Sequence, residues 1–383
     1  MSALASRPAL RWAIPAAALV AVIGAGSAGR MLVANASSGL PERSPQQLLM
    51  DVAQARVNSL SGTIVQKSDL GLPTLPQLDG TNLNQMVTGN HTVKVWYDGP
   101  NHVRVSMQGD GTSESDLIRN GSNVWTYDSA AKAATHRTLT GKEKSGQQGA
   151  PGVMPKGGPS GLPSGAPTSL SGGVSQLLSS LAPTTKVSTD GTAKVAGRQA
   201  YELVVTPKDS ASRIQQIRIA VDGDKHIPLR LQVYARGSDT PAFEAGFTQV
   251  AFAKPDASEF TFNPPAGTKV TEAKGDEHAR PAHPGRTPEK KADEPKMVGK
   301  GWTTVVVAKG VDTTVPAGKT AEQKKAAAAA TKFLNSLPKV HGSWGSGRLI
   351  ETKLFSVLLT DDGRLIAGAV DPSALYQAAA QAK

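Results

Sequence analysis

The 383-residue chain contains no cysteine, and aromatic residues make up only 4% of it. Without cysteine, the chain cannot form disulfides, thiolate metal sites, a cysteine nucleophile or the lipidated cysteine of a bacterial lipoprotein. It also lacks any run of Lys and Arg interleaved with aromatics, and any helix-turn-helix, RNA-binding or zinc-finger pattern. We therefore expect no nucleic-acid partner. The length allows one medium and one small domain, each with its own core.

Convergent polar groups of the kind that an enzyme needs are also missing. The seven histidines are scattered, and His278 and His283 lie in a charged, proline-containing stretch without the fixed geometry of a metal site. Residues 342–347 (Gly-Ser-Trp-Gly-Ser-Gly) lack the spacing of a nucleophile elbow. Asp361-Asp362-Gly363 is typical of a turn. The sequence therefore predicts a protein that is not an enzyme, with no catalytic residue, metal site or cofactor.

Positive charge is in excess, with 42 Lys and Arg against 31 Asp and Glu, a net charge of +11. This excess favours anionic phospholipid or wall polymers outside a cell as partners. At the N-terminus, Arg7 and Arg11 precede an uncharged stretch at residues 12–29, which small residues at Ala34 and Ala36 follow. The pattern is typical of an export segment. Residues 1–36 are either a signal peptide cleaved after about Ala36 or an uncleaved anchor, and both put the chain outside the cytoplasmic membrane, periplasmic, secreted or anchored on the extracellular face.

Residues 37–270 have the pattern of a mainly β domain. Ser44, Pro45 and Gln47 form the start signal of a helix, with Ser44 as N-cap. Later segments alternate apolar and polar residues with period two and are joined by Gly- and Asp-containing turns, which predicts an antiparallel meander. The apolar positions of the predicted strands are occupied by Val93, Val95, Tyr97, Val103, Val105, Leu203, Val205, Ile217, Ile219, Leu229, Leu231, Val233, Phe243, Phe247, Phe260 and Phe262.

Two segments interrupt this pattern. Residues 141–168 contain almost only Gly, Pro and Ser with a few lysines, which predicts a flexible exposed insertion. Residues 170–181 carry leucines, including Leu177 and Leu178, at helical spacing before Pro183. The narrow apolar stripe of this helix needs an apolar surface to lie on.

Beyond the β domain, residues 271–300 mix both charges with Pro and His and are predicted to form a linker. Residues 301–383 then predict a small α+β module. Its expected elements are strands at 302–308, 349–360 and 365–370, an Ala-rich helix at 320–337, and a last helix that begins at Asp371-Pro372.

Four motifs occur in a characteristic order. They are Pro100-x-x-x-Arg104, the turn Asn120-Gly121, the strand Trp125-x-Tyr127-Asp128, and Phe260-x-Phe262 followed by Pro265 and Gly267. In this order the chain resembles the LolA-like superfamily of periplasmic lipoprotein carriers over residues 44–270. Asn120 and Ser129 depart from its pattern, where the carriers usually have Asp and Pro.

The resemblance implies an α+β fold with an incomplete antiparallel β-barrel and a helical lid. The lid would consist of helices at 45–57 and 170–181, and acyl chains of lipids or lipoproteins would enter between lid and sheet. The expected lining of this apolar sack is Trp125, Tyr127, Leu177, Leu178, Leu203, Ile219 and Leu231. The alternative is that these side chains simply fill a core. The scarcity of large side chains favours a cavity, because one long curved sheet is then hard to fill at native packing density.

The added module also makes the chain similar to two-domain envelope-stress sensors of the RseB type. That similarity implies a membrane anti-sigma factor as a partner. Two functions therefore follow from the sequence: a carrier or chaperone of lipoproteins at the membrane surface, or a sensor that regulates an anti-sigma factor.

Overall fold

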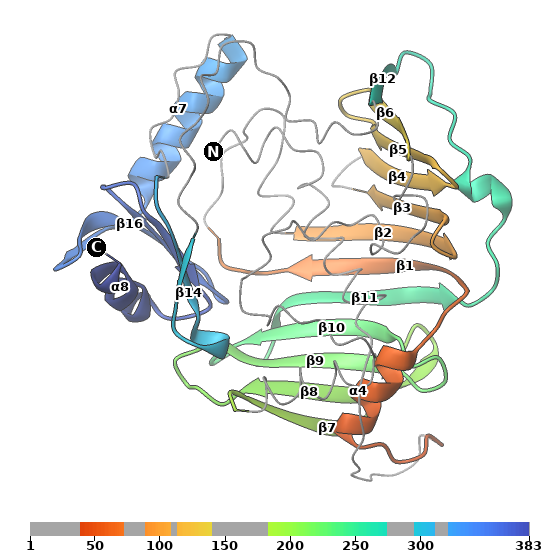
Figure 1. Cartoon of the computed structure of the whole chain (residues 1–383), viewed down its shortest axis with the longest axis horizontal. Coiled ribbons are helices and arrows are strands. Elements are labelled where there is room, and N and C mark those ends of the chain that lie inside the picture. The colour runs from red at the N-terminus through yellow and green to blue at the C-terminus, as the bar shows by residue number, and fades with distance from the viewer. Residues whose placement is uncertain are drawn as a thin grey trace.

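A computed structural model describes residues 39–72, 89–108, 113–139, 183–273, 295–310 and 321–382. Within them the chain forms a large curved sheet and a smaller C-terminal module (Figure 1). The predicted export segment, the insertion at 141–168 and the helix at 170–181 lie outside the described residues. None of the described helices is long and apolar enough to cross a membrane.

The large sheet has twelve strands and is open, as expected for a mainly β fold with an incomplete barrel. Its order is β12-β6-β5-β4-β3-β2-β1-β11-β10-β9-β8-β7, so two sets of consecutive strands meet where β1 pairs with β11. Every neighbouring pair is antiparallel except β12 with β6. The strands are β1 (Ser59–Ser68), β2 (Gly89–Asp98), β3 (His102–Gln108), β4 (Glu114–Asn120), β5 (Asn123–Asp128), β6 (Ala133–Thr138), β7 (Thr185–Val195), β8 (Arg198–Pro207), β9 (Ile214–Asp222), β10 (Pro228–Ala235), β11 (Pro241–Ala251) and β12 (Lys269–Ala273).

The first described helix, α4 (Pro45–Gln54), begins where the sequence predicts. The Ser44 hydroxyl accepts a hydrogen bond from the Gln47 amide at 3.3 Å, and the Ser44 amide donates to the Gln47 side chain at 3.1 Å. This capping box satisfies two amides that the first turn leaves without helical partners. The helix packs Leu48 onto Tyr201 and Leu203 of β8, so it covers the outermost strands of the sheet.

The segment that the sequence predicts as the closing strand is different. Phe260 ends a short 3₁₀ helix, η2 (Ala257–Phe260), and Phe262 lies in irregular chain before strand β12 begins at Lys269. Pro264 and Pro265 explain the difference, because proline has no N–H to donate to a sheet ladder. The prediction of a strand at Phe260 and Phe262 is therefore wrong.

One end of the large sheet folds back on itself and makes a core. β7 and β11 are in contact although β8, β9 and β10 separate them in the sheet. The buried cluster there joins side chains from both sets of strands: Leu60, Ile64, Val93, Val95, Val195, Ala200, Ala220, Ile227, Leu229, Ala245 and Phe247. This part of the domain is packed by the protein's own side chains, and none of the predicted lining residues that the structure describes belongs to the cluster.

The C-terminal module is a six-stranded sheet, of order β13-β14-β18-β17-β16-β15, with two helices. Its elements are β13 (Lys296–Val298), η3 (Gly301–Thr303), β14 (Val305–Ala308), α7 (Ala321–Ser336), β15 (Lys339–Gly342), β16 (Gly345–Glu351), β17 (Ser356–Thr360), β18 (Leu365–Gly368) and α8 (Pro372–Gln381). The predicted α+β class is confirmed. The prediction of a single strand at 349–360 is wrong. A tight turn interrupts it, in which the Thr352 hydroxyl accepts hydrogen bonds from the amides of Leu354 and Phe355.

A buried arginine ties the elements of this module together. Arg364 donates to the carbonyl oxygens of Ala379 in α8, at 2.6 Å, and of Trp344 before β16, at 3.0 Å. Its guanidinium also pairs with Asp362 at 2.8 Å. Since these carbonyls come from separate elements, one side chain holds the helix and the strands of the module in place.

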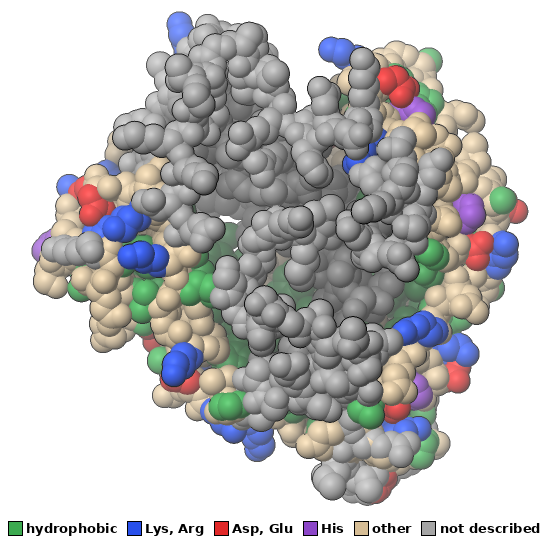
Figure 2. Space-filling view, in the orientation of Figure 1, with side chains coloured by type: hydrophobic (Ala, Val, Ile, Leu, Met, Phe, Trp, Pro, Cys, Tyr) green, Lys and Arg blue, Asp and Glu red, His purple; other side chains and the backbone are tan. Residues whose placement is uncertain are grey.

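The module is fixed to the large sheet by polar contacts and an apolar patch. Arg213, just before β9, pairs with Glu351 at 2.6 Å and with Asp371 at 3.4 Å, and its amide donates to the Ala369 carbonyl. The Trp302 indole N–H donates to the Thr185 hydroxyl at 2.8 Å. The apolar patch consists of Leu70, Leu72, Ala235, Ala242, Leu354 and Phe355. Hydrophobic side chains gather where the module meets the sheet (Figure 2).

At the end of strand β9, the carboxylate of Asp222 is fully buried and accepts four hydrogen bonds. Two come from Arg198, and the amides of Lys225 and Asp224 donate the others at 2.6 Å and 3.0 Å. Burial raises the pKa of Asp222, but the bonds from Arg198, Lys225 and Asp224 together outweigh it, so the pKa lies below its ordinary value.

This lowered pKa predicts a pH-dependent stability. Because the carboxylate is favoured in the folded state, its contribution is present at neutral pH and is lost as the pH falls below about 4 toward the folded-state pKa. We expect Asp222→Asn to lower the free energy of unfolding by about 2 kcal/mol at pH 7 and by much less near pH 3, measured by urea unfolding. Asp239→Asn, in an exposed turn, should change neither value; an equal loss for Asp222→Asn at both pH values would contradict the prediction.

Candidate functional site

The register of the large sheet divides its side chains between two faces. On neighbouring strands Leu203 is paired with Ile219, Ile219 with Leu231, and Leu231 with Ala245. Directly paired residues point to the same side of a sheet, so these four share one face. We call it the apolar face. Its counterpart carries Glu202, Arg218 and Arg230, and we call it the charged face. Since the α4 residue Leu48 contacts Leu203, helix α4 lies on the apolar face.

Two neighbouring rows of aliphatic and aromatic side chains cross β8 to β11 on the apolar face. The first row is Leu203, Ile219, Leu231 and Ala245, and the second is Val205, Ile217, Val233 and Phe243. We call them the apolar rows. Leu203 and Ala245 are buried, whereas Ile217, Ile219 and Leu231 are only half-buried. The rows are thus a continuous apolar surface that the described residues cover only in part.

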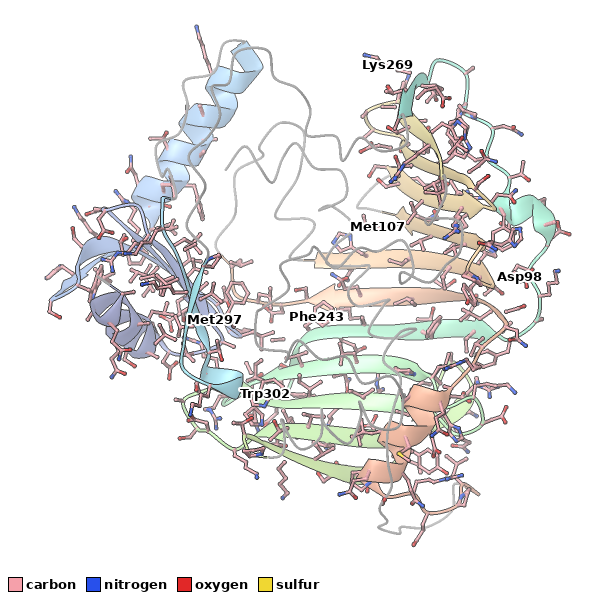
Figure 3. The ribbon with its side chains drawn as sticks, in the orientation of Figure 1. Asp98, Met107, Phe243, Lys269, Met297 and Trp302 are labelled. Carbon is pink, nitrogen blue, oxygen red and sulfur yellow. The ribbon has the colours of Figure 1, made fainter. Side chains whose placement is uncertain are left out.

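The apolar rows reach toward the C-terminal module. Phe243 lies on the side of the sheet that faces the module, at the opposite end from Asp98 (Figure 3). The next residue, Ala242, belongs to the patch that contacts Leu354 and Phe355 of the module. A molecule bound along the rows would therefore lie next to the module.

The structure brings together only part of the predicted lining. Leu203, Ile219 and Leu231 are consecutive members of one apolar row. Trp125 opposes Ile118, Ile118 opposes Arg104, and Arg104 opposes Trp96 on successive strands. Following this register places Trp125 and Tyr127 on the charged face. Leu177 and Leu178 lie outside the described residues. The predicted set is thus divided between the two faces of the sheet.

Trp125 and Tyr127 form a small aromatic cluster with the segment that follows η2. Both rings lie 5.4 Å from Phe262, and Trp125 stacks on His136 at 4.3 Å. Phe260 lies 5.6 Å from His102. The aromatic motifs in the sequence therefore attach residues 257–262 to the charged face, which is a structural role.

Elsewhere on the charged face, ion pairs occupy the surface. Glu202 is buried and accepts from Arg218 at 3.1 Å and from Arg230 at 2.7 Å. Asp116 is paired with Arg104 at 2.7 Å, although burial still raises the pKa of Asp116 above its ordinary value. An acyl chain on this face would have to displace paired charges, so the apolar rows are the candidate binding site.

Two residues that were not predicted extend the first apolar row. Ala245 opposes Gln66 of β1, and Gln66 opposes His91 of β2. The alternation of Ile64 with Gln66, and of Val93 with His91, contains the information that these polar residues face the apolar side. The described residues contain no group of three or more His, Cys, Asp or Glu that could hold a metal ion.

No protein-family model and no curated protein sequence matches the chain. Among solved structures, it is similar to the MucA/MucB complex of Pseudomonas aeruginosa, with 17% identity, coverage of 87% of this chain and 95% of that chain, and a TM-score of 0.41. It is also similar to a LolA superfamily protein from Nitrosomonas europaea, with 10% identity, coverage of 56% and 96%, and a TM-score of 0.21. A third similar structure is a putative outer membrane lipoprotein-sorting protein domain from Vibrio parahaemolyticus, with 11% identity, coverage of 53% and 89%, and a TM-score of 0.19.

One of these similar structures is described as a LolA superfamily protein, the superfamily that the sequence motifs resemble. All three TM-scores are below 0.5, so these similarities carry no argument about a ligand or a partner. The chemistry of this protein is therefore argued from its own residues.

The aromatic cluster generates a prediction about stability. Phe262→Ala removes the ring that Trp125 and Tyr127 share, so we expect the free energy of unfolding to fall by about 1–3 kcal/mol, because the ring is only half-buried. Urea unfolding measures this value. Val270→Ala, at an exposed position, is the control and should have no effect. If Phe262→Ala is as stable as the wild type, the cluster does not hold this segment.

Proposed function

We propose that this protein binds acyl chains of lipids or lipoproteins on the apolar rows of its large sheet, as a carrier or chaperone outside the cytoplasmic membrane. The observation that carries the proposal is the pair of adjacent rows of apolar side chains, most of which are half-buried. They face the same side as helix α4, and the opposite face of the same strands is occupied by ion pairs.

The energetics of such binding are favourable. Each methylene removed from water contributes about 0.8 kcal/mol, so a long acyl chain supplies enough for micromolar affinity even after the costs of association. A row of side chains that crosses several strands suits an extended chain better than a compact ligand. Binding of this kind needs no catalytic group and no cofactor, consistent with a protein that is not an enzyme.

The proposed location follows from the N-terminal sequence and the charge. Arg7 and Arg11 before an uncharged stretch favour export, and the net charge of +11 favours contact with anionic phospholipid at a membrane surface. A carrier of acyl chains has to approach such a surface to load and unload.

A matched pair of substitutions tests the proposal. Ile217 and Gln216 are neighbours in β9, both half-buried, and they face opposite sides of the sheet. Ile217→Glu places a charge in an apolar row, so we expect the affinity for a fluorescent long-chain fatty acid to fall at least tenfold. Gln216→Glu adds the same charge on the charged face and should leave the affinity unchanged.

Circular dichroism shows that both variants are folded before the fluorescence titration is interpreted. No saturable binding by the wild type would refute the proposal. Equal weakening by the two variants would place the ligand somewhere other than the apolar rows.

A second candidate function is a sensor of acyl ligands that regulates an anti-sigma factor. The specific observation that favours it is the attachment of the module beside the apolar rows, through Arg213 and through Leu70, whose carbonyl accepts from the Lys353 amide at 2.8 Å. A ligand that alters these contacts would change what the module presents to a partner.

Hydrogen exchange tests this second candidate. The amides of Arg213 and Lys353 bridge the module and the sheet, and a sensor should exchange them faster when a fatty acid is bound. Arg213→Ala, which removes the ion pairs with Glu351 and Asp371, should exchange them fast in both states. If exchange in the wild type does not change at saturating fatty acid, the sensor function is excluded and the carrier function is the remaining candidate.

A further inference from the structure

Two buried polar side chains lie at one end of the first apolar row. Gln66 is 3% exposed and His91 is 5% exposed, and the two are directly opposed in the β1–β2 ladder. The residues next to them along their strands on the same face are Ile64 and Val93, and Ala245 opposes Gln66 from β11. The pair is therefore a small polar site in apolar surroundings.

In the described part of the chain, His91 differs from most other buried polar side chains, which have a hydrogen-bond partner. Arg119, on the same face, donates to Asn101 at 2.9 Å and to the Gly121 carbonyl at 3.1 Å. At least one side-chain hydrogen bond is also made by Ser44, Ser106, Asp116, Thr185, Glu202, Ser212, Asp222, Thr352, Ser356, Thr360 and Arg364.

Both ring nitrogens of His91 are buried and have no hydrogen-bond partner. A buried polar group without a partner destabilises the folded protein, and such groups are rare in native structures. An imidazole with both nitrogens unpaired, directly opposite the buried amide of Gln66, therefore requires an explanation. One explanation is a ligand that supplies the missing hydrogen bonds.

We propose that Gln66 and His91 bind the carbonyl-bearing polar end of an acyl lipid whose tail lies along the apolar rows. This inference rests on the proposed function and adds which end of the ligand goes where. Neutral imidazole has one donor and one acceptor nitrogen, and the glutamine amide has both kinds of group. Together they match the oxygens of a carboxyl group or an ester.

The dimensions fit this arrangement. From Gln66 in β1 to Leu203 in β8 the row crosses β11, β10 and β9, and at about 4.8 Å between strands it spans about 19 Å. An extended acyl chain with its oxygens at Gln66 and His91 would pass over Ala245, Leu231 and Ile219. Its tail would end near Leu203, where helix α4 closes the face.

The test compares three ligands of equal chain length: dodecanoic acid, methyl dodecanoate and dodecane. Each displaces an apolar fluorescent probe from the full-length protein at pH 7. We expect the wild type to bind the acid or the ester at least tenfold more tightly than dodecane, and the better of the two identifies a free acid or an esterified lipid as the source. His91→Leu should bind the acid and the ester about tenfold more weakly and dodecane unchanged.

Gln66→Leu is a second variant with the same expected direction, and His341→Leu, at an exposed histidine, is the control that should change nothing. Because His91 has no partner in the folded chain, His91→Leu should also keep or raise the thermal midpoint. If no ligand displaces the probe, the proposed function itself fails. If the ligands bind but the wild type does not distinguish them, or His91→Leu keeps the preference, this inference fails and acyl binding stands.

Discussion

The large sheet depends on the antiparallel pairing of β1 with β11. Ser61 opposes Ala251 and Ser68 opposes Phe243, so this one ladder joins two sets of hairpin-connected strands into a single surface. The apolar rows acquire their length from it, because residues of β8 to β11 become continuous with Gln66 and His91 of β1 and β2. The same ladder carries an irregularity between Thr63 and Ile64, and Ile64 belongs to the buried core cluster.

The two faces of the large sheet have different structural roles. On the charged face, Arg218, Arg230 and Glu202 neutralise one another, and the aromatic cluster of Trp125, Tyr127 and Phe262 attaches the chain between β11 and β12. On the apolar face, one end is filled by the protein's own side chains, while the rows beside the module are only half-buried. The candidate site is therefore the half-buried part of the apolar face.

Much of this architecture could be predicted because its causes are local. Ser44, Pro45 and Gln47 specify the helix start within one turn, and alternation with period two marks the strands. Leu203, Ile219 and Leu231 were predicted together because their strands are consecutive and their turns are short. The position of Trp125 and Tyr127 relative to them depends on the β1–β11 register and its irregularity, which no local pattern contains.

Two other errors have equally physical origins. The aromatic alternation at Phe260 and Phe262 predicts a strand, yet Pro264 and Pro265 cannot donate to a ladder. Gln66 and His91 were missed because polar residues inside an apolar alternation look like the solvent face. Their burial follows only from the strands on either side.

The β1–β11 pairing also has a consequence for how the protein is made. Each set of strands forms from contacts between neighbours in sequence, whereas β1 and β11 are far apart in the chain, so loop-closure entropy delays their meeting. A chain that emerges N-terminus first completes β1 long before β11 exists. Until then the edge of β1 that will meet β11 offers its N–H and C=O groups to any other strand, which makes a nascent chain prone to aggregation and dependent on protection of that edge.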